Sequence, residues 1–136
     1  MNTASRRYRI LIVDDEAPMR LLIAHFINES MNAQVSLAGT GERAVRLVEE
    51  STFDVILLDL LMPGMGGFEV LKHIRAGKLN KTTPVIVVSV LSSSIAGDPA
   101  TTYERAVALG ANAFVSKPLS RSGLVNAVKA QLGVTA

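Results

Sequence analysis

The sequence Val55-Ile56-Leu57-Leu58-Asp59 decides the fold of this chain. Four apolar residues run up to a carboxylate, and Pro63 and Gly64 follow shortly after it. An apolar run this short, bounded by Pro and Gly, is typical of a strand buried on both faces of a parallel sheet. Packing does not require the charge of Asp59. An unpaired buried carboxylate is costly or takes up a proton, so the rest of the chain must explain what keeps Asp59 ionised.

Further apolar segments on either side predict the remainder of the sheet. The predicted strands cover residues 8–13, 32–37, 53–58, 84–89 and 113–116. Helical periodicity and capping residues predict helices that begin near Pro18, Gly41, Phe68, Pro99 and Ser120. Strands and helices in alternation predict an α/β fold, with a doubly wound five-stranded parallel sheet and five helices on its two faces.

Two segments carry additional patterns. In the first predicted helix, apolar residues recur at i, i+3, i+4, i+7 and i+8, which is typical of a stripe that faces the core. These residues are Met19, Leu22, Ile23, Phe26 and Ile27. The segment 32–37 alternates instead, which favours an edge strand.

Length and composition favour one domain and exclude several classes of site. The 136 residues suit a domain over 8–132, with a flexible basic N-terminus at 1–7 and a tail at 133–136. The absence of Cys excludes disulfides and thiolate metal sites. No apolar run approaches the ~18 residues that cross a membrane. The net charge of +2 is scattered, so we expect neither membrane binding nor direct nucleic-acid binding.

Polar side chains stand where the predicted strands end. Asp14 and Asp15 follow the first strand, Asp59 follows the third, Ser89 ends the fourth and Lys117 follows the fifth. In an open parallel sheet, ligands bind outside the carboxyl ends of the strands. We therefore expect these five side chains to gather at one rim of the sheet.

Three carboxylates at one rim repel one another, and one of them should take up a proton unless a cation intervenes. Lys117 is one candidate cation, and a divalent ion is the other. An all-oxygen carboxylate site suits Mg²⁺. A carboxylate next to a cation and a hydroxyl has the surroundings of a nucleophile, because carboxylates form acyl-phosphate intermediates. Metal, ammonium and hydroxyl would then neutralise the oxygens of a transferring phosphoryl group.

These residues resemble a known family. The matching positions are Asp14-Asp15, Asp59 followed by Met62-Pro63 and Gly67, Ser89, and Lys117-Pro118. In this order they resemble the receiver domain of two-component response regulators, over about residues 8–132. The resemblance implies a flavodoxin-like sheet with strand order 2-1-3-4-5 and a cytoplasmic location. It implies a signalling switch rather than an enzyme, limited to Mg²⁺-dependent self-phosphorylation from a donor and slow self-dephosphorylation.

The resemblance also implies a role for each acidic residue. Asp59 accepts a phosphoryl group from a phosphohistidine on a sensor histidine kinase or a histidine phosphotransfer protein. Asp15 and Asp59 bind Mg²⁺ through their side chains, and Leu61 does so through its backbone carbonyl. Asp14 acts mainly through a metal-bound water.

By the same resemblance, Lys117, Ser89 and Phe114 connect the site to an output surface. Lys117 pairs with Asp59 and then with the phosphoryl group, while the Ser89 hydroxyl moves to bind a phosphoryl oxygen. Phe114 turns inward when Ser89 moves. The surface of helix 99–109, strand 113–116 and the last helix then contacts a downstream target protein or a fused output domain.

The sequence departs from the family pattern at several positions near the site. Val90 follows Ser89, where a small residue is usual, and a β-branched side chain there narrows access to the pocket. Leu61 and Leu91 are apolar where polar residues help to position the attacking water, which predicts slow self-dephosphorylation. Gly66 replaces a residue that is commonly acidic. The loop 91–97 is longer than usual.

Two other functions compete with the phospho-accepting receiver. An aspartyl-phosphate phosphatase generally carries Asp-x-Asp after the first strand, whereas this chain has Asp14-Asp15-Glu16. A protein-interaction module on the same fold, independent of phosphorylation, is the stronger alternative. Val90 and the long loop keep it open, whereas the complete acidic set and Lys117 argue against it. Single residues also have plainer interpretations, since Asp14 alone suits a helix cap and Phe114 alone suits the core.

Overall fold

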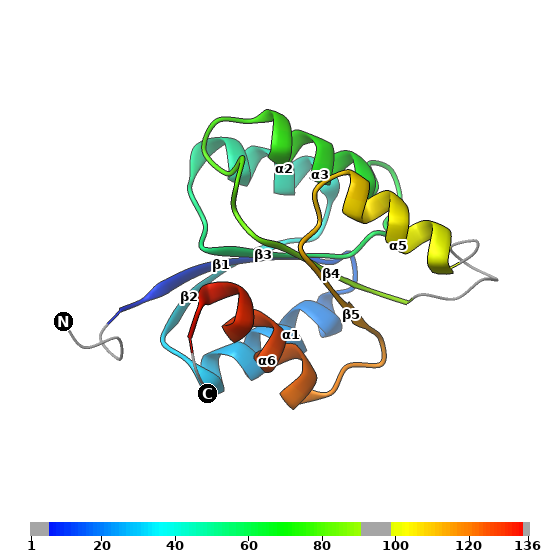
Figure 1. Cartoon of the computed structure of the whole chain (residues 1–136). Helices are drawn as coiled ribbons and strands as arrows, with labels where there is room; N and C mark the ends of the chain where they lie inside the picture. The colour runs from blue at the N-terminus through cyan, green and yellow to red at the C-terminus, as the bar shows by residue number, and fades with distance from the viewer. Residues whose placement is uncertain (1–5, 91–98, 135–136) are drawn as a thin grey trace.

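The computed structural model describes residues 6–90 and 99–134, which form five strands and five helices around one sheet (Figure 1). The strands are β1 (Tyr8–Val13), β2 (Ala33–Ala38), β3 (Val55–Leu58), β4 (Val85–Ser89) and β5 (Ala113–Ser116). The helices are α1 (Ala17–Ser30), α2 (Gly41–Glu50), α3 (Gly67–Ala76), α5 (Pro99–Ala108) and α6 (Arg121–Leu132). The strand order is β2-β1-β3-β4-β5 and all pairs are parallel, which confirms the predicted fold.

Strand β3 lies at the centre of the sheet and is buried on both faces. It pairs with β1 on one side and with β4 on the other. Ile56 and Leu58 pack in one core layer, and Val55 and Leu57 pack in the layer on the opposite face. This burial on both sides is what the uninterrupted apolar run predicts.

The helices cover both faces of the sheet (Figure 1). Helices α2 and α3 pack over the face that carries Leu58, while α1 and α6 pack over the face that carries Leu57. Helix α5 contributes Ala106, which packs with Leu60 and Val87 in a smaller cluster. Leu60 follows Asp59 directly, so this cluster connects α5 to the segment after the central strand.

The structure differs from the sequence-based prediction at the start of the central strand and at one residue of α1. The central strand begins at Val55 rather than at residue 53, because the backbone N–H of Phe53 donates to the Asn80 side chain instead of to a neighbouring strand. Leu22 was predicted to face the core but is 39% exposed. Ile23 and Ile27 are buried on α1, and Leu22 lies on the flank of that stripe. The predicted loop 91–97 lies outside the described residues.

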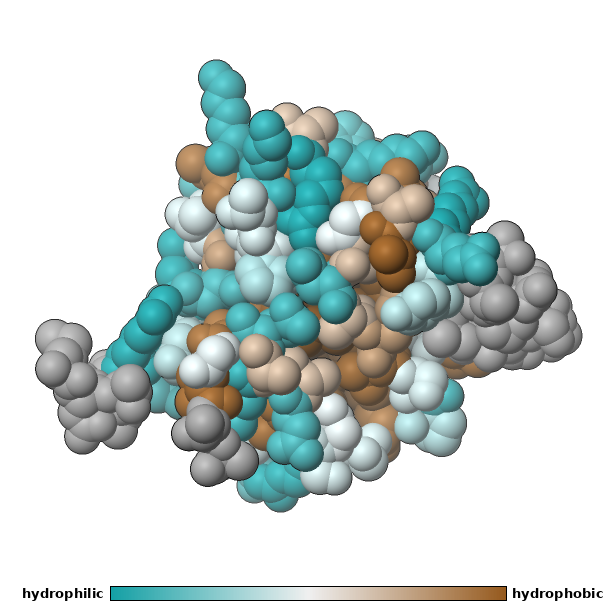
Figure 2. Space-filling model, viewed as in Figure 1, coloured by the Kyte–Doolittle hydropathy of each residue, from teal (hydrophilic) through white to brown (hydrophobic). Residues whose placement is uncertain are grey.

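The surface is mostly polar. Figure 2 shows hydrophilic residues over much of one face, with apolar residues exposed between them. The large apolar side chains that are more than half exposed in the described ranges are Leu21 on α1 and Tyr103 on α5. None of the helices in those ranges is long and apolar enough to cross a bilayer.

The turn between β3 and α3 contains two neighbouring glycines, of which only the second is required for space. A Cβ added at Gly67 would collide with the backbone carbonyl of Asp59 and approach the Leu60 Cα to 2.5 Å. A Cβ added at Gly66 would find its nearest neighbour, the Leu60 carbonyl oxygen, at 3.5 Å. Gly66 occupies the N-cap position of α3 without a side-chain cap. The close approach at Gly67 therefore brings α3 directly against the residue that follows β3.

We predict that Gly66→Asp increases the free energy of unfolding by about 0.5–1 kcal/mol, because an aspartate at the N-cap accepts a backbone hydrogen bond and favours the helix dipole. Gly67→Ala, one residue away, should decrease it by about 1–3 kcal/mol through overpacking. Urea denaturation of the two variants measures both effects. A Gly66→Asp variant less stable than the natural chain would contradict the assigned cap.

Candidate functional site

The carboxyl ends of β1, β3, β4 and β5 bring four of the predicted residues together. Asp14 follows β1, Asp59 follows β3, Ser89 ends β4 and Lys117 follows β5, and each lies at the same rim of the sheet. Asp14, Asp59 and Ser89 are almost fully buried, with exposed fractions of 1%, 4% and 1%. Three polar side chains are thus held in the interior, directly beyond a sheet whose strands are apolar.

Asp59 is held by three donors. Its Oδ1 accepts a hydrogen bond of 2.8 Å from the Ser89 hydroxyl and one of 3.1 Å from the backbone N–H of Leu61. Its Oδ2 lies 3.4 Å from the Lys117 ammonium. Both carboxylate oxygens are therefore oriented, and the donors come from three different segments of the chain.

Lys117 lies closer to Asp14 than to Asp59. Its Nζ is 2.8 Å from the Asp14 Oδ2, and the other Asp14 oxygen accepts a hydrogen bond of 2.9 Å from the backbone N–H of Glu16. The family resemblance implies a pair between Lys117 and Asp59, whereas in the structure the lysine bridges the carboxylates of Asp14 and Asp59. Asp14 therefore also shapes the turn into α1, as a lone capping residue would.

Burial has the largest effect on the charge of Asp59. Desolvation raises the pKa of the Asp59 carboxyl above its ordinary value, and the Ser89 hydrogen bond, the Lys117 charge and the Leu61 N–H oppose that rise. Repulsion by Asp14 is the smallest cause. Burial of Lys117 opposes its charge, but its hydrogen bond to Asp14 and the charges of Asp59 and Asp14 outweigh burial and raise the pKa of the ammonium.

Asp15 completes a group of three carboxylates at the rim. It is exposed, unlike Asp14 and Asp59, and one oxygen from each of the three lies within 4.8 Å of the others. Mg²⁺ binds oxygen ligands at ~2.1 Å, which places opposite ligands roughly 4 Å apart. The spacing and the all-oxygen donor set therefore fit a divalent cation, after a small closure of the carboxylates around it.

A cavity of about 230 Å³ opens at this group. Its lining comprises Asp15, Glu16, Asp59, Leu61, Ser89, Val90 and Lys117. Val90, which was predicted to narrow access, lines the cavity and is itself 36% exposed. Leu61 also lines the cavity, and its backbone N–H donates to Asp59. The site is accordingly a small acidic cavity with one lysine and one hydroxyl at its base.

Phe114 lies beside the site, on β5. It pairs in register with Val87 on β4, two residues before Ser89. Its ring is half-buried, lies 4.6 Å from the ring of Tyr103 on α5 and packs against the cluster that contains Leu60. The position expected of a switch residue is thus in contact with α5 and adjacent to the strand that carries Ser89.

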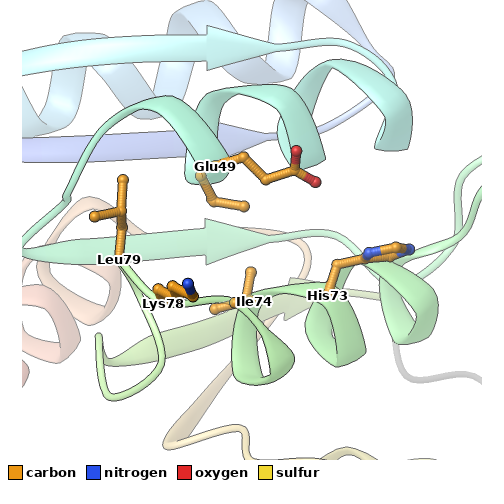
Figure 3. A pocket seen from close by; sticks show the side chains of 7 residues that line it. Glu49, His73, Ile74, Lys78 and Leu79 are labelled. Carbon is orange, nitrogen blue, oxygen red and sulfur yellow. The ribbon is translucent and has the colours of Figure 1, made fainter.

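A larger cavity, of about 380 Å³, lies between α2 and α3 (Figure 3). Val48, Ile74 and Leu79 supply its apolar lining, and Glu49 and His73 stand at its edge. It is formed by the C-terminal parts of two helices, away from the strand ends that carry the carboxylates.

The sequence did not point to every residue at the site. Glu16, which no motif marks as a site residue, lines the acidic cavity. Arg20 on α1 is half-buried and donates to the Asp14 carbonyl, and no spacing or motif in the sequence distinguishes it from the other arginines. His25 and His73 are exposed, and His25 lies 3.2 Å from Glu29. The Lys117-Pro118 peptide bond is cis.

Comparisons with known proteins agree on one family. The sequence model of the response regulator receiver domain matches residues 10–129. The chain is 36% identical over 124 residues to the transcriptional regulatory protein ResD of Bacillus subtilis, covering 91% of this chain and 48% of ResD. It is 29% identical to a probable chemotaxis protein CheY of Rhizobium etli, covering 95% of each. This chain thus spans about half of the transcriptional regulator.

Solved structures agree on the fold. The chemotaxis protein CheY4 of Vibrio cholerae superposes with a TM-score of 0.84 at 27% identity. The match covers 93% of this chain and all of CheY4. The likeness therefore extends over the whole sheet and its helices.

We predict that Asp59→Asn makes the Mg²⁺-free chain more stable at neutral pH. Burial raises the pKa of Asp59 in the folded state above its ordinary value of 3.8. Between the ordinary and the raised pKa, the folded state therefore binds more protons than the unfolded state, and the free energy of unfolding falls as pH rises. Asparagine does not ionise and avoids this loss, and Lys117 still has Asp14 as its partner. Thermal unfolding followed by circular dichroism from acid to neutral pH measures the difference.

Two controls accompany this prediction. Asp54→Asn removes a carboxylate that is hydrogen-bonded to Arg6 and Arg9, so it should lower the unfolding temperature. Mg²⁺ should stabilise the natural chain more than the Asp59→Asn variant. An Asp59→Asn variant that is less stable at neutral pH without Mg²⁺ would contradict the burial effect.

Proposed function

Since the chain belongs to the response regulator receiver domain family of two-component systems, we propose that Asp59 is its phosphoryl acceptor. The observation that carries the proposal is the environment of Asp59. Its carboxylate is buried, oriented by Ser89, Leu61 and Lys117, and open to an acidic cavity. Aspartate is rarely this buried, and a carboxylate that only terminates a strand would have no need to lie against a cavity lined by two further acidic residues.

The proposed reaction transfers a phosphoryl group from a phosphohistidine on a sensor histidine kinase or a histidine phosphotransfer protein. An Asp59 oxygen forms a bond to phosphorus as the bond between phosphorus and the imidazole nitrogen breaks, and the nitrogen keeps the electron pair. Lys117 and Ser89 supply an ammonium and a hydroxyl to the phosphoryl oxygens, whose charge must be neutralised in the transition state. Leu61 N–H holds the carboxylate in position.

The acidic group would hold Mg²⁺, as receiver domains typically do. The proposed ligands are the side chains of Asp15 and Asp59 and the backbone carbonyl of Leu61, with Asp14 acting through a bound water. When bound, Mg²⁺ supplies positive charge next to the phosphoryl oxygens. Its charge also favours the ionised form of Asp59, which burial disfavours.

The proposed switch runs from Ser89 to Phe114. The Ser89 hydroxyl now donates to the Asp59 Oδ1, an oxygen close to where the phosphoryl group would be attached. Movement of Ser89 toward a phosphoryl oxygen would alter the space beside β5, where Phe114 contacts Tyr103. The output surface would be α5, β5 and α6, on which Tyr103 and Val107 are 51% and 46% exposed. Its partner would be a downstream target or a fused output domain.

We predict that Mg²⁺ with acetyl phosphate or a phosphoramidate adds one phosphoryl group to the chain. Intact-protein mass spectrometry measures the gain, and Asp59→Asn should abolish it because the acceptor oxygen is lost. Omission of Mg²⁺ should slow the gain by at least about 100-fold.

The same measurement separates the alternatives. No gain with any donor would favour an interaction module that is independent of phosphorylation. Rapid turnover of unrelated phosphate esters would favour a phosphatase. A gain that persists in Asp59→Asn would assign the phosphoryl group to another residue.

We predict that the aspartyl phosphate hydrolyses slowly, because Leu61 lines the cavity and its apolar side chain has no group that could orient a water. Leu61→Asn introduces an amide of similar size and should accelerate hydrolysis by about 10-fold. The decay of the phosphorylated mass after donor removal gives both rates. Loss within seconds in the natural chain, or no acceleration in Leu61→Asn, would contradict the role assigned to Leu61.

A further inference from the structure

Asp14 is fixed at all four of its polar groups. Its N–H donates to Ala38 across β1 and β2, and its two carboxylate oxygens accept from Glu16 and Lys117. The fourth group, the backbone carbonyl, accepts a hydrogen bond of 2.8 Å from the Nη1 of Arg20, which reaches back from α1. This last contact is the one that no part of the proposed reaction explains.

The Asp14 carbonyl belongs to the peptide unit that joins Asp14 to Asp15. A peptide unit is planar, so a hydrogen bond to its oxygen also fixes the direction of the Asp15 N–H and the start of the Asp15 backbone. The Asp15 carboxylate itself is exposed. Its position among the three carboxylates therefore depends on the backbone that carries it, and Arg20 holds that backbone.

The structure leaves room for the Arg20 guanidinium by placing a glycine beneath it. A Cβ added at Gly39, in the turn between β2 and α2, would lie 2.8 Å from the Arg20 Nη1 and 3.2 Å from its Cζ. The backbone of Gly39 has no positive φ, so the glycine is required for space and not for its conformation. Arg20 thereby connects the β1–α1 turn to the β2–α2 turn.

We propose that Arg20 is a positioning residue for the divalent cation: it orients the Asp14–Asp15 peptide so that Asp15 completes the acidic group. This inference rests on the proposed function, since it concerns the Mg²⁺ that phosphorylation requires. Residues that orient ligands from outside the coordination shell commonly change metal affinity by 10–100-fold.

An effect of charge and an effect of positioning predict opposite changes in Mg²⁺ affinity when Arg20 is removed. A cation near three carboxylates repels Mg²⁺, so an arginine that acted only through its charge would weaken Mg²⁺ binding, and its removal would tighten it. An arginine that positions Asp15 strengthens binding, and its removal weakens it. The direction of the change therefore identifies the role.

The test is an NMR titration of the ¹⁵N-labelled chain with MgCl₂, which reads binding without phosphorylation. Arg20→Met, which keeps an unbranched apolar stem and loses the guanidinium donors, should weaken Mg²⁺ binding by about 10-fold. Arg20→Lys, which keeps the charge and one donor, should recover part of this loss. Arg46→Met removes the same charge from the exposed side of α2 and should not weaken binding.

A double-mutant cycle protects the test against a general loss of structure. Gly39→Ala should weaken Mg²⁺ binding in the natural chain by displacing the guanidinium, and should have little effect in Arg20→Met, where that space is free. In phosphorylation by acetyl phosphate, Arg20→Met should need more Mg²⁺ for half-maximal rate and retain a near-natural rate at saturation.

Each outcome decides the inference. Unchanged or tighter Mg²⁺ binding in a folded Arg20→Met variant would overturn it and leave the proposed function intact. Additive effects of Gly39→Ala and Arg20→Met would also overturn it, since the two sites would then act independently. A natural chain that neither binds Mg²⁺ nor accepts a phosphoryl group would overturn the proposed function as well.

Discussion

The structure depends on one buried arrangement, in which Lys117 bridges Asp14 and Asp59. Its ammonium lies 2.8 Å from one carboxylate and 3.4 Å from the other, and all three side chains are at most 8% exposed. One positive charge between two buried negative charges leaves a net negative centre in a region of low dielectric. Such a centre is stable only with further hydrogen bonds, and it favours a second cation. The same property that costs stability would favour binding of the proposed Mg²⁺.

The topology of the sheet itself brings these charged side chains together. Parallel strands start from the same edge, so side chains that follow β1, β3, β4 and β5 meet at the opposite rim. The apolar residues of β3 are covered by helices on both faces, which gives the rim a rigid base. The turns that follow the strands then adjust the site, as Gly67 does below Asp59 and Gly39 does below Arg20.

The sequence was sufficient for the fold and for the membership of the site, because both follow from where apolar runs end. Asp59, Ser89 and Lys117 each stand at a strand terminus, and a parallel sheet leaves them no other place. The sequence was insufficient for contacts that depend on side-chain reach and burial. The closer pairing of Lys117 with Asp14 is one example. The pKa of Asp59 is another example, since desolvation raises it more than repulsion from Asp14 does. The depth at which a side chain is buried is a property of the packed structure and cannot be read from the sequence.

A ¹³C NMR titration of the Asp59 carboxyl, with and without Mg²⁺, tests most directly whether a cation is what keeps this buried carboxylate, the proposed phosphoryl acceptor, ionised. The structure predicts a pKa above the ordinary value of 3.8 in the metal-free chain, and a lower pKa when Mg²⁺ is bound. A pKa at or below 3.8 without Mg²⁺, or one that Mg²⁺ leaves unchanged, would contradict it.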